Sequence, residues 1–412
     1  MTPDDSAHPE RDRPSTESKP DTNTHGPLAG VRVLDLSSVL MGPAATRMLG
    51  DLGADVIFVE PAKGDRNRTM GSGPAEGFSG ISLNLLRNKR SVAIDLKQPR
   101  GRQAFLDIAA TCDVMITNLR PGPLRRLGLH YEAVREVRDN IVFCRAHGYP
   151  SSSDQADAPA YDDIIQSASG VGDLFRRMGG EPMLLPSLVA DKVCGLTIAN
   201  AVLAALYHRS LTGEGQCIEI PMINVMRAFV LTEHGSGAIS EPPVADAGYA
   251  RILTPERKPQ PTADGWINIL PYDQAHYVAL FEAGGRLDLA TDERFATPIE
   301  RVVHSDSLYR DVATVLSQRT TADWLEFCAA HGIPATEAAT LDELIEQLPV
   351  DEHPVAGPYR VIPPPEQFSE TPAGIRRPAP GIGEHGREVL SEIGYHAASI
   401  DELEAEGILA SP

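Results

Sequence analysis

Short apolar runs alternate with amphipathic helical stretches through the first half of this 412-residue chain. VRVLDL at 31–36 is followed by the helical stretch GPAATRMLGDLG at 42–53 and then by ADVIFVE at 54–60. The pattern continues with SVAIDL at 91–96, GRQAFLDIAATC at 101–112, DVMITNL at 113–119 and IVFCRAHGY at 141–149. Strands that alternate with helices form right-handed βαβ units, so the pattern predicts an α/β fold with a Rossmann-like parallel sheet.

The first strand-to-helix turn lacks the glycine fingerprint of dinucleotide-binding proteins. SSVLMGP at 37–43 stands where GxGxxG is expected, which disfavours a nicotinamide-dependent oxidoreductase. The formal net charge of -20 disfavours nucleic acid and anionic membranes as partners, because both require basic surface. A small phosphate-bearing ligand stays compatible with this charge, since it needs only a local basic patch.

The cysteines indicate a reducing compartment. Five of them are scattered without CxxC spacing, and this odd count, together with the lack of a signal peptide, favours the cytoplasm. No metal site is expected. The apolar segment 196–207 is shorter than the roughly 20 residues of a membrane span and contains Asn200, so we expect a buried helix there.

Composition shifts along the chain suggest its domain boundaries. Residues 1–26 are rich in Pro, Ser, Thr, Asp and Glu and predict a disordered leader. Residues 27–230 are assigned to a large domain, 231–355 to a linker and a small α/β domain, and 356–412 to a return linker and C-terminal helices.

One carboxylate stands at the entry of a long helical pattern. Asp191 lies in VADKVCG at 189–195, directly before LTIANAVLAALYHR. An Asp at this place commonly caps the helix by accepting backbone N–H groups. The other hypothesis is that the carboxylate does chemistry, and position alone leaves both open.

Several stretches, in this order along residues 27–394, resemble the family III CoA-transferases, which include formyl-CoA and carnitine CoA-transferases. They are PLAGVRVLDLSSVLMGP, LGDLGADVIFVEP, GD followed by Arg68, NKRSVAIDLKQPRG, DVMITNLRPGPLRRLGL, YDDIIQSASG, VADKVCG, HRSLTGEGQCIEIPM and PAPGIGEHGREVLSEIGY. The resemblance implies a Rossmann-like large domain built from both chain ends, a smaller inserted α/β domain and an interlocked homodimer.

The resemblance also implies a chemistry for Asp191, which matches the catalytic aspartate of the family. The carboxylate would attack an acyl-CoA thioester and form a mixed anhydride and then an aspartyl-CoA thioester. A carboxylic acid would accept the CoA. The implied ligands are therefore acyl-CoA and a carboxylic acid, with coenzyme A as part of the substrate and no permanently bound cofactor.

Two other functions stay open. The same fold group contains α-methylacyl-CoA racemases, which carry a His where this chain has Tyr161. A tyrosine, with a pKa of about 10, is a poor base at neutral pH, so the position favours transfer. A catalytically silent acyl-CoA-binding protein is the third hypothesis.

Residues at strand ends and in arginine-rich turns are the candidates for binding CoA, because ligands of open parallel sheets bind at the carboxyl ends of the strands. They are Val39, Leu40, Arg68, Leu85, Asn88, Lys89, Arg90, Asn118, Leu119, Arg120, Arg126 and His147. Tyr149 and Tyr161 are expected to line the substrate pocket.

Several of these residues have a plain structural alternative. Arg68 could be a solvated surface residue, and Tyr149 could simply pack. Asp162 and Asp163 are adjacent, so in a helix they point about 100° apart and cannot form a paired carboxylate site with each other. The basic residues of RILTPERKPQP at 251–261 could meet CoA phosphate from a second chain or solvate a linker.

Overall fold

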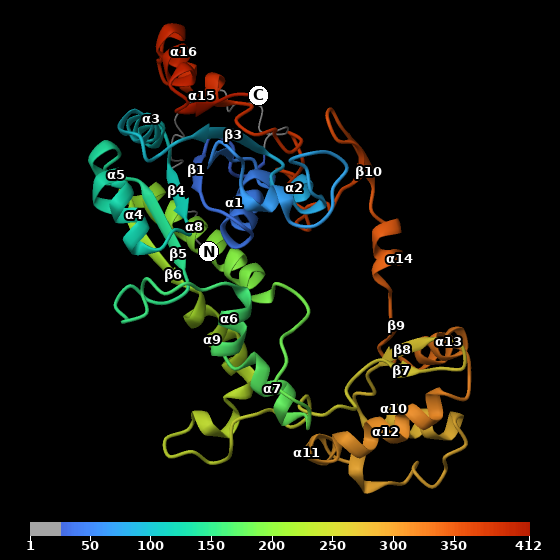
Figure 1. Ribbon diagram of the computed structural model, residues 1–412. Helices are drawn as coiled ribbons and strands as arrows, with labels where there is room; N and C mark the ends of the chain where they lie inside the picture. Colours follow the sequence, from blue (N-terminus) through green and yellow to red (C-terminus); the bar gives the residue numbers. More distant parts are fainter. Residues whose placement is uncertain (1–25) are drawn as a thin grey trace, which may run out of the picture.

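A seven-stranded sheet forms the centre of the large lobe in the computed structural model, which describes residues 26–412 (Figure 1). The strand order is β12-β3-β2-β1-β4-β5-β6. The strands are β1 (Arg32–Leu36), β2 (Asp55–Glu60), β3 (Lys89–Ile94), β4 (Val114–Thr117), β5 (Val142–His147), β6 (Gln216–Pro221) and β12 (Leu409–Ala410). All but β12 pair in parallel, in the 3-2-1-4-5-6 order of dinucleotide-binding folds. This confirms the predicted α/β fold with a mostly parallel sheet.

Neighbouring residues on one strand point into two separate hydrophobic cores, as the pleat requires. Val33 joins the core on one face of the sheet and Leu34 the core on the other. The first core is covered by α1 (Met41–Asp51), α6 (Asp162–Ala168), α7 (Val171–Arg177), α8 (Val189–Thr212) and α9 (Met222–His234). The second is covered by α3 (Pro99–Ala110), α4 (Pro121–Leu127), α5 (Tyr131–Val137), α15 (Gly386–Glu392) and α16 (Ala397–Ala405).

Both chain ends contribute to the large lobe. Leu409 and Ala410 in β12 pair antiparallel with Ile94 and Ala93 in β3, at the sheet edge. The predicted leader, 1–26, lies outside the described residues except for Gly26, which is buried and belongs to the folded part.

Helix α8 is the helix expected from the sequence over 196–207, but it is buried along one face only, since Leu196 and Tyr207 are exposed. By length and composition it is apolar enough to cross a membrane, with a mean hydropathy of 1.6. Its inner side chains, among them Cys194, Ile198 and Val202, are buried in the first core together with Met41 and Leu49 of α1. The helix is therefore a packing element between the sheet and its neighbours.

A small lobe follows α9 and has its own core, around Phe281, Phe295 and Trp324 (Figure 1). It contains β7 (Gln260–Pro261), β8 (Trp266–Ile269), β9 (Ala335–Glu337), α10 (Gln274–Ala283), α11 (Pro298–Val303), α12 (Ser305–Leu316) and α13 (Thr321–His331). The chain returns through α14 (Leu341–Glu346) and the hairpin of β10 (Val350–His353) and β11 (Gly357–Arg360). There the ring of His353 lies 4.6 Å from that of Phe78, on the large lobe.

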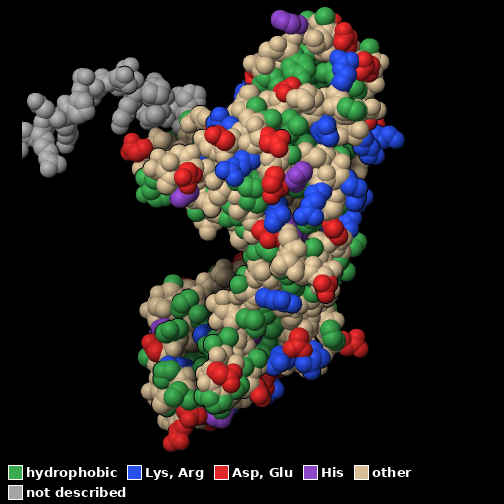
Figure 2. All heavy atoms as spheres, turned by 90° about the vertical axis from the view of Figure 1, so that its left-hand side faces the viewer, with side chains coloured by type: hydrophobic (Ala, Val, Ile, Leu, Met, Phe, Trp, Pro, Cys, Tyr) green, Lys and Arg blue, Asp and Glu red, His purple; other side chains and the backbone are tan. Residues whose placement is uncertain are grey.

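The charged side chains are mixed in sign over the face that Figure 2 shows. Lys and Arg are interspersed with Asp and Glu there, and among the described residues on that face no extended basic patch is visible.

Candidate active site

A cavity of about 300 Å³ opens at the carboxyl ends of β1, β4 and β5. Eight residues proposed from the sequence line it together: Val39, Leu40, Asn118, Leu119, Arg120, His147, Tyr161 and Asp191. The remaining lining residues are Ser38, Met41, Arg66, Pro123, Gly148, Ala158, Pro159, Ala160 and Met222. The strand order reverses between β1 and β4, and such a switch point is where open α/β sheets bind ligands.

The amide of Asn118 ties the two strands together at this switch point. Its Oδ1 accepts from the backbone N–H of Ser38 at 3.0 Å, and its Nδ2 donates to the Ser38 carbonyl at 2.8 Å. Asn118 follows β4 and Ser38 follows β1, so this reciprocal pair sets the floor of the cavity.

Val39 adopts a left-handed backbone conformation, with φ of +68°. A β-branched residue rarely occupies this region, and strain of this kind clusters at functional sites. The conformation is supported by Asp65, whose carboxylate accepts the Val39 N–H at 3.2 Å. Asp65 also caps the short helix η2 (Arg66–Thr69), so the same carboxylate places Arg66 beside the cavity.

Asp191 lies in the first turn of α8 rather than at its cap. The N-cap residue is Leu188, whose side chain makes no cap hydrogen bond. The capping hypothesis for Asp191 is therefore wrong. Asp191 is only 9% exposed, and it lines the cavity.

Asp162 takes over the role expected of Asp191. Its Oδ1 accepts the backbone N–H of Asp191 at 3.0 Å. Its Oδ2 accepts from Gln166, whose amide also bonds the Ser187 carbonyl and the Leu185 N–H in the loop before α8. From the sequence we considered Asp162 only as a partner of Asp163, and its contact with Asp191 was not predicted.

Burial and, as the smaller cause, the nearby charge of Asp162 together raise the pKa of Asp191 to about 7. The helix dipole favours an anion at this end of α8. Desolvation and like-charge repulsion outweigh the dipole here. At neutral pH the carboxyl group is thus poised between its neutral and ionised forms.

His147 is a neutral residue of the cavity. Its Nε2 lies 3.1 Å from Glu219 Oε1, and burial lowers its pKa. The same glutamate accepts the Ser151 N–H at 2.7 Å. His147 can therefore shape the cavity, but a neutral imidazole brings no positive charge to a phosphate.

Two cationic side chains stand at the rim. Arg66 Nη1 lies 3.5 Å from the hydroxyl of Tyr161, whose side chain is well exposed. Arg120 donates to the carbonyl of Asp157, and the Asp157 carboxylate accepts the Gly122 N–H at the start of α4. Arg66 was not singled out from the sequence, because nothing in GDRNRT distinguishes it from Arg68.

The structure places three other predicted CoA ligands elsewhere, in buried ion pairs. Arg68 is bidentate to Glu60 at 2.6 and 2.7 Å, so its description as a solvated surface residue is wrong. Lys89 is fully buried against Asp35 at 3.1 Å, and Arg90 pairs with Asp55 at 2.6 Å. These cations stabilise the fold and do not line the cavity.

The NKR stretch is not the turn that the sequence suggested. Strand β3 begins at Lys89, so only Asn88 lies in the turn, with φ of +59°. The Asn88 amide bonds Asp51 and the backbone of the returning C-terminal segment at Gly374. A lysine can start this strand because Asp35 compensates its buried charge.

The last three candidates also lie outside the cavity. Leu85 is buried in α2 (Gly80–Leu85), and Tyr149 packs on the first core. Arg126 lines an adjoining hollow of about 470 Å³ with Lys97 and Arg102. Pro123 borders both spaces, so the hollow and the cavity adjoin.

Asp191 offers a carboxyl group that changes its charge near neutral pH, and it lies at the switch point of a doubly wound sheet. The adjoining hollow is lined with cations. Together these features define the class of enzymes that handle a nucleotide-bearing substrate. Within residues 26–412, no group of three or more His, Cys, Asp or Glu side chains is arranged to hold a metal ion.

Comparison with known proteins identifies the family. The model of CoA-transferase family III matches residues 28–386, and the chain belongs to this family. A succinate–glutarate CoA-transferase of Agrobacterium fabrum is 32% identical over 386 residues, covering 90% of this chain and 96% of the relative. The beta subunit of succinyl-CoA–L-malate CoA-transferase from Chloroflexus aurantiacus is 31% identical over 421 residues, covering 94% and 99%.

A solved structure agrees with this assignment. The crystal structure of a CAIB/BAIF family protein from Brucella suis has a TM-score of 0.76 at 27% identity, covering 90% of this chain and all of that one. The chain is thus an enzyme of the CoA-transferase type, a family whose substrates are CoA thioesters.

The position of Asp162 leads to a prediction about the pKa of Asp191. Asp162→Asn keeps an oxygen acceptor for the Asp191 N–H but removes the negative charge, so the pKa of Asp191 should fall from about 7. It should stay above the ordinary value of 3.8, because burial is the larger cause. Titration of carboxyl-¹³C-labelled aspartate by NMR measures both values.

The exposed neighbour Asp163 supplies the control, since Asp163→Asn should leave the Asp191 titration unchanged.

The raised pKa of Asp191 also means that the native state holds one more proton than the unfolded chain between pH 3.8 and about 7. Folding stability contributed by Asp191 should therefore fall as the pH rises through that window. An ordinary pKa for Asp191 in the unaltered protein would contradict this account.

Proposed function

We propose that this enzyme transfers CoA from an acyl-CoA thioester to a carboxylic acid through covalent intermediates on Asp191. The observation that carries the proposal is the desolvated carboxyl group of Asp191 in the lining of the cavity, in a chain of this family. A carboxylate stripped of water is a better nucleophile than a solvated one, because less hydration must be lost when it attacks.

The first half-reaction loads CoA onto the enzyme. The ionised carboxylate of Asp191 attacks the thioester carbonyl, the C–S bond breaks, and CoA leaves as a thiolate with the electron pair. The product is a mixed anhydride. The thiolate then attacks the aspartyl carbonyl of the anhydride, which releases the donor acid as a carboxylate and leaves an aspartyl-CoA thioester.

The second half-reaction reverses these steps with a different acid. The acceptor carboxylate attacks the aspartyl-CoA carbonyl, expels the thiolate and forms a second anhydride. Attack of the thiolate on the acyl carbonyl of that anhydride gives the new acyl-CoA and restores the Asp191 carboxylate. No net proton transfer is needed, which fits a cavity whose histidine, His147, is already held by Glu219.

The adjoining hollow suits the nucleotide end of CoA. Lys97, Arg102 and Arg126 line it, and its lining includes no Asp or Glu among the described residues. Phosphates bind where such cations gather. A CoA molecule with its phosphates there would reach Asp191 past Pro123, where the two spaces adjoin.

We propose dicarboxylic acids as the substrate class. The relatives named above act, by their names, on succinate, glutarate and malate. In this chain Arg66 and Arg120 line the same cavity as Asp191, whose carboxyl group is the single one in the described lining. One carboxylate of the acid would react at Asp191, while a guanidinium pairs with the other.

Transfer is favoured over epimerisation by the residue at position 161. Tyr161 lines the cavity where racemase-type members carry a histidine. A phenol is a poor base near neutral pH, and the imidazole of the cavity, His147, is engaged by Glu219, so the described lining offers no free base besides Asp191 to remove the proton alpha to the thioester.

We further propose that two chains form a homodimer. Its support is an apolar surface on the large lobe that is exposed in the single chain. Leu196, Tyr207 and Leu211 recur at helical spacing along one exposed face of α8 and form it, and Phe229 adds an exposed ring on the neighbouring α9. Exposed apolar side chains gathered in this way mark association surfaces.

Asp191→Ala should lower kcat by about 10⁴-fold or more, because it removes the nucleophile. Mixing the unaltered enzyme with succinyl-CoA and then borohydride should reduce the aspartyl-CoA thioester, and peptide mass spectrometry should find the reduced residue at position 191. The exposed Asp163→Asn serves as the matched control and should retain both activity and labelling. Labelling at another residue, or none with a broad panel of acyl-CoA donors, would sink the covalent mechanism.

Arg66→Gln and Arg120→Gln should weaken recognition of the second carboxylate. We expect KM for glutarate to rise about tenfold in at least one of them, the usual size of a lost charge-assisted hydrogen bond. KM for pentanoate, which has one carboxylate and the same chain length, should change little. Arg125→Gln on α4, which does not line the cavity, is the control. Equal losses for both acids would argue against dicarboxylate selection.

Light scattering on the purified protein should give the mass of two chains. Replacing Tyr207 and Leu211 by Lys places two charges on the apolar surface of α8, and should shift the mass toward one chain. Leu341→Lys on α14 is the control, since Leu341 is exposed but lies away from α8. A single-chain mass for the unaltered protein would refute the homodimer.

A further inference from the structure

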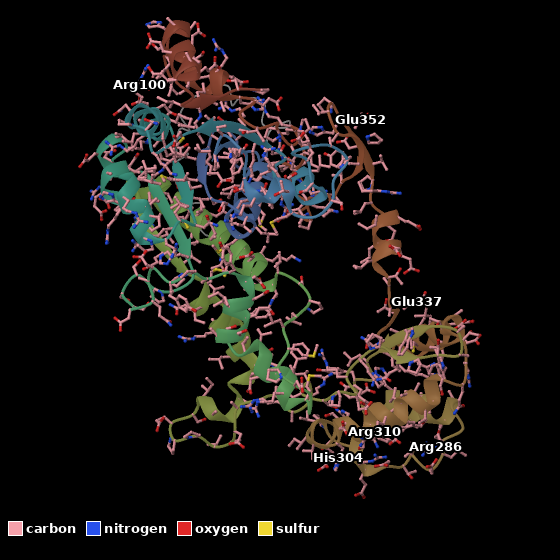
Figure 3. The ribbon with its side chains drawn as sticks, in the orientation of Figure 1. Arg100, Arg286, His304, Arg310, Glu337 and Glu352 are labelled. Atoms are coloured by element: carbon pink, nitrogen blue, oxygen red, sulfur yellow. The ribbon has the colours of Figure 1, made fainter. Side chains whose placement is uncertain are left out.

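A second cavity of about 230 Å³ lies where the segment after α9 meets the small lobe. We call it the hinge pocket. Its lining residues are Tyr249, Arg251, Leu270, Pro271, Tyr272, Tyr277, Pro298, Arg301, Val302, Ser305 and Tyr309. Figure 3 shows the side chains of this lobe around the labelled His304, which lies between the pocket residues Val302 and Ser305 in sequence, and Arg310, which follows Tyr309.

Two guanidinium groups face this pocket without a carboxylate partner. No Asp or Glu lies among its lining residues, and in the described part of the chain no carboxylate oxygen lies within 4.0 Å of Arg251 or Arg301. Three other arginines of the lobe differ, since Arg286, Arg294 and Arg310 pair with Asp288, Asp292 and Asp306. Arg319 also lacks a carboxylate partner among the described residues, but it lies over the ring of Trp324 and donates to the Ala283 carbonyl. In a chain of net charge -20, two arginines left together in a cavity are suited to an external anion.

The pocket is held rigidly enough to act as a binding site. The ring of Tyr277 stacks on that of Phe295 at 5.2 Å, and Arg301 Nη1 donates to the Phe295 carbonyl at 2.7 Å. On the opposite side, the Tyr249 N–H donates to His234 Nδ1 at 3.3 Å, which anchors the wall to the end of α9.

The hydroxyl groups complete a set of donors. Burial raises the pKa of Tyr277 to about 12, although the nearby Arg251 and Arg301 lower it, so its hydroxyl stays protonated at neutral pH. Ser305 and Tyr309 add two more hydroxyl groups to the lining. An anion would thus meet guanidinium forks and neutral O–H donors together.

The shape of the pocket selects among anions. Leu270, Pro271, Pro298 and Val302 supply an apolar wall, which a bare phosphate would leave without contacts. The volume lies below the roughly 300–1,000 Å³ of drug-sized ligand pockets, so the ligand is small. A short aliphatic chain with a carboxylate head satisfies both the wall and the planar guanidinium groups.

We propose that the hinge pocket binds a small aliphatic carboxylate through Arg251 and Arg301, at a site separate from Asp191. Arg251 belongs to the segment that joins the lobes and Arg301 to α11, so the bound acid bridges the linker and the small lobe. This inference is independent of the chemistry proposed for Asp191. It also gives Arg251 of the RILTPERKPQP stretch a role other than solvating a linker.

Fluorine NMR of protein labelled with 3-fluorotyrosine tests the proposal, with Tyr277→Phe, Tyr309→Phe and Tyr161→Phe used to assign signals. Succinate or glutarate should shift the Tyr277 and Tyr309 signals in a saturable way. Arg301→Gln and Arg251→Gln should each weaken this response about tenfold or more. Arg310→Gln, on α12 but outside the pocket lining, should leave it unchanged.

The Tyr161 signal reports on the cavity of Asp191 in the same spectra, so binding at the two sites is told apart. Retained dispersion of the other tyrosine signals shows that each variant is folded. The proposal is overturned if no acid up to about 20 mM shifts Tyr277 and Tyr309, since weak small ligands bind in the millimolar range. It is also overturned if inorganic phosphate or CoA, rather than the short acids, produces the shifts, or if neither arginine variant weakens them.

Discussion

A lysine ammonium group enclosed within the large lobe holds the site together. Lys89 Nζ lies 3.1 Å from Asp35 Oδ2, 2.8 Å from Thr46 Oγ1 and 3.0 Å from the Pro43 carbonyl. A buried charge is tolerated only with such partners, so β3, β1 and the first turn of α1 are locked in one arrangement. Asp35 also accepts the Ser37 N–H at 3.1 Å, which fixes the start of the turn that carries Val39 and Leu40. The cavity is shaped by that turn.

The two ends of the chain depend on each other in a similar way. Arg90 on β3 binds Glu388 and Glu392 of α15, about three hundred residues later. Strand β12 then closes the sheet edge beside β3. The small lobe is consequently an insertion within one continuous large lobe, and the hinge pocket lies on one of the two connections between them. Carboxylic acids could act at both places, as reacting groups at Asp191 and as bridging ligands at the hinge.

The sequence located most of the cavity but misjudged its cations. Val39, Leu40, Asn118, Leu119 and Arg120 follow strands, and parallel strands end at one edge of a sheet, so their meeting could be predicted. Arg68, Lys89 and Arg90 also lie near strands, yet they are buried against carboxylates of other strands: Lys89 and Arg90 against Asp35 and Asp55 from distant segments, and Arg68 against Glu60 at the end of β2. Whether an arginine meets solvent, a ligand or a carboxylate depends on its neighbours in space, which local patterns do not contain.

The sequence by itself determined the α/β class, the parallel sheet and the family. It also singled out Asp191 as the candidate catalytic residue. These depend on local periodicity and on motifs in a fixed order, both of which are properties of the chain. Only the tertiary structure decided the state of Asp191. Its raised pKa comes from burial and from Asp162, 29 residues away and on another helix. Electrostatic free energies depend on distance and desolvation, and folding alone sets both.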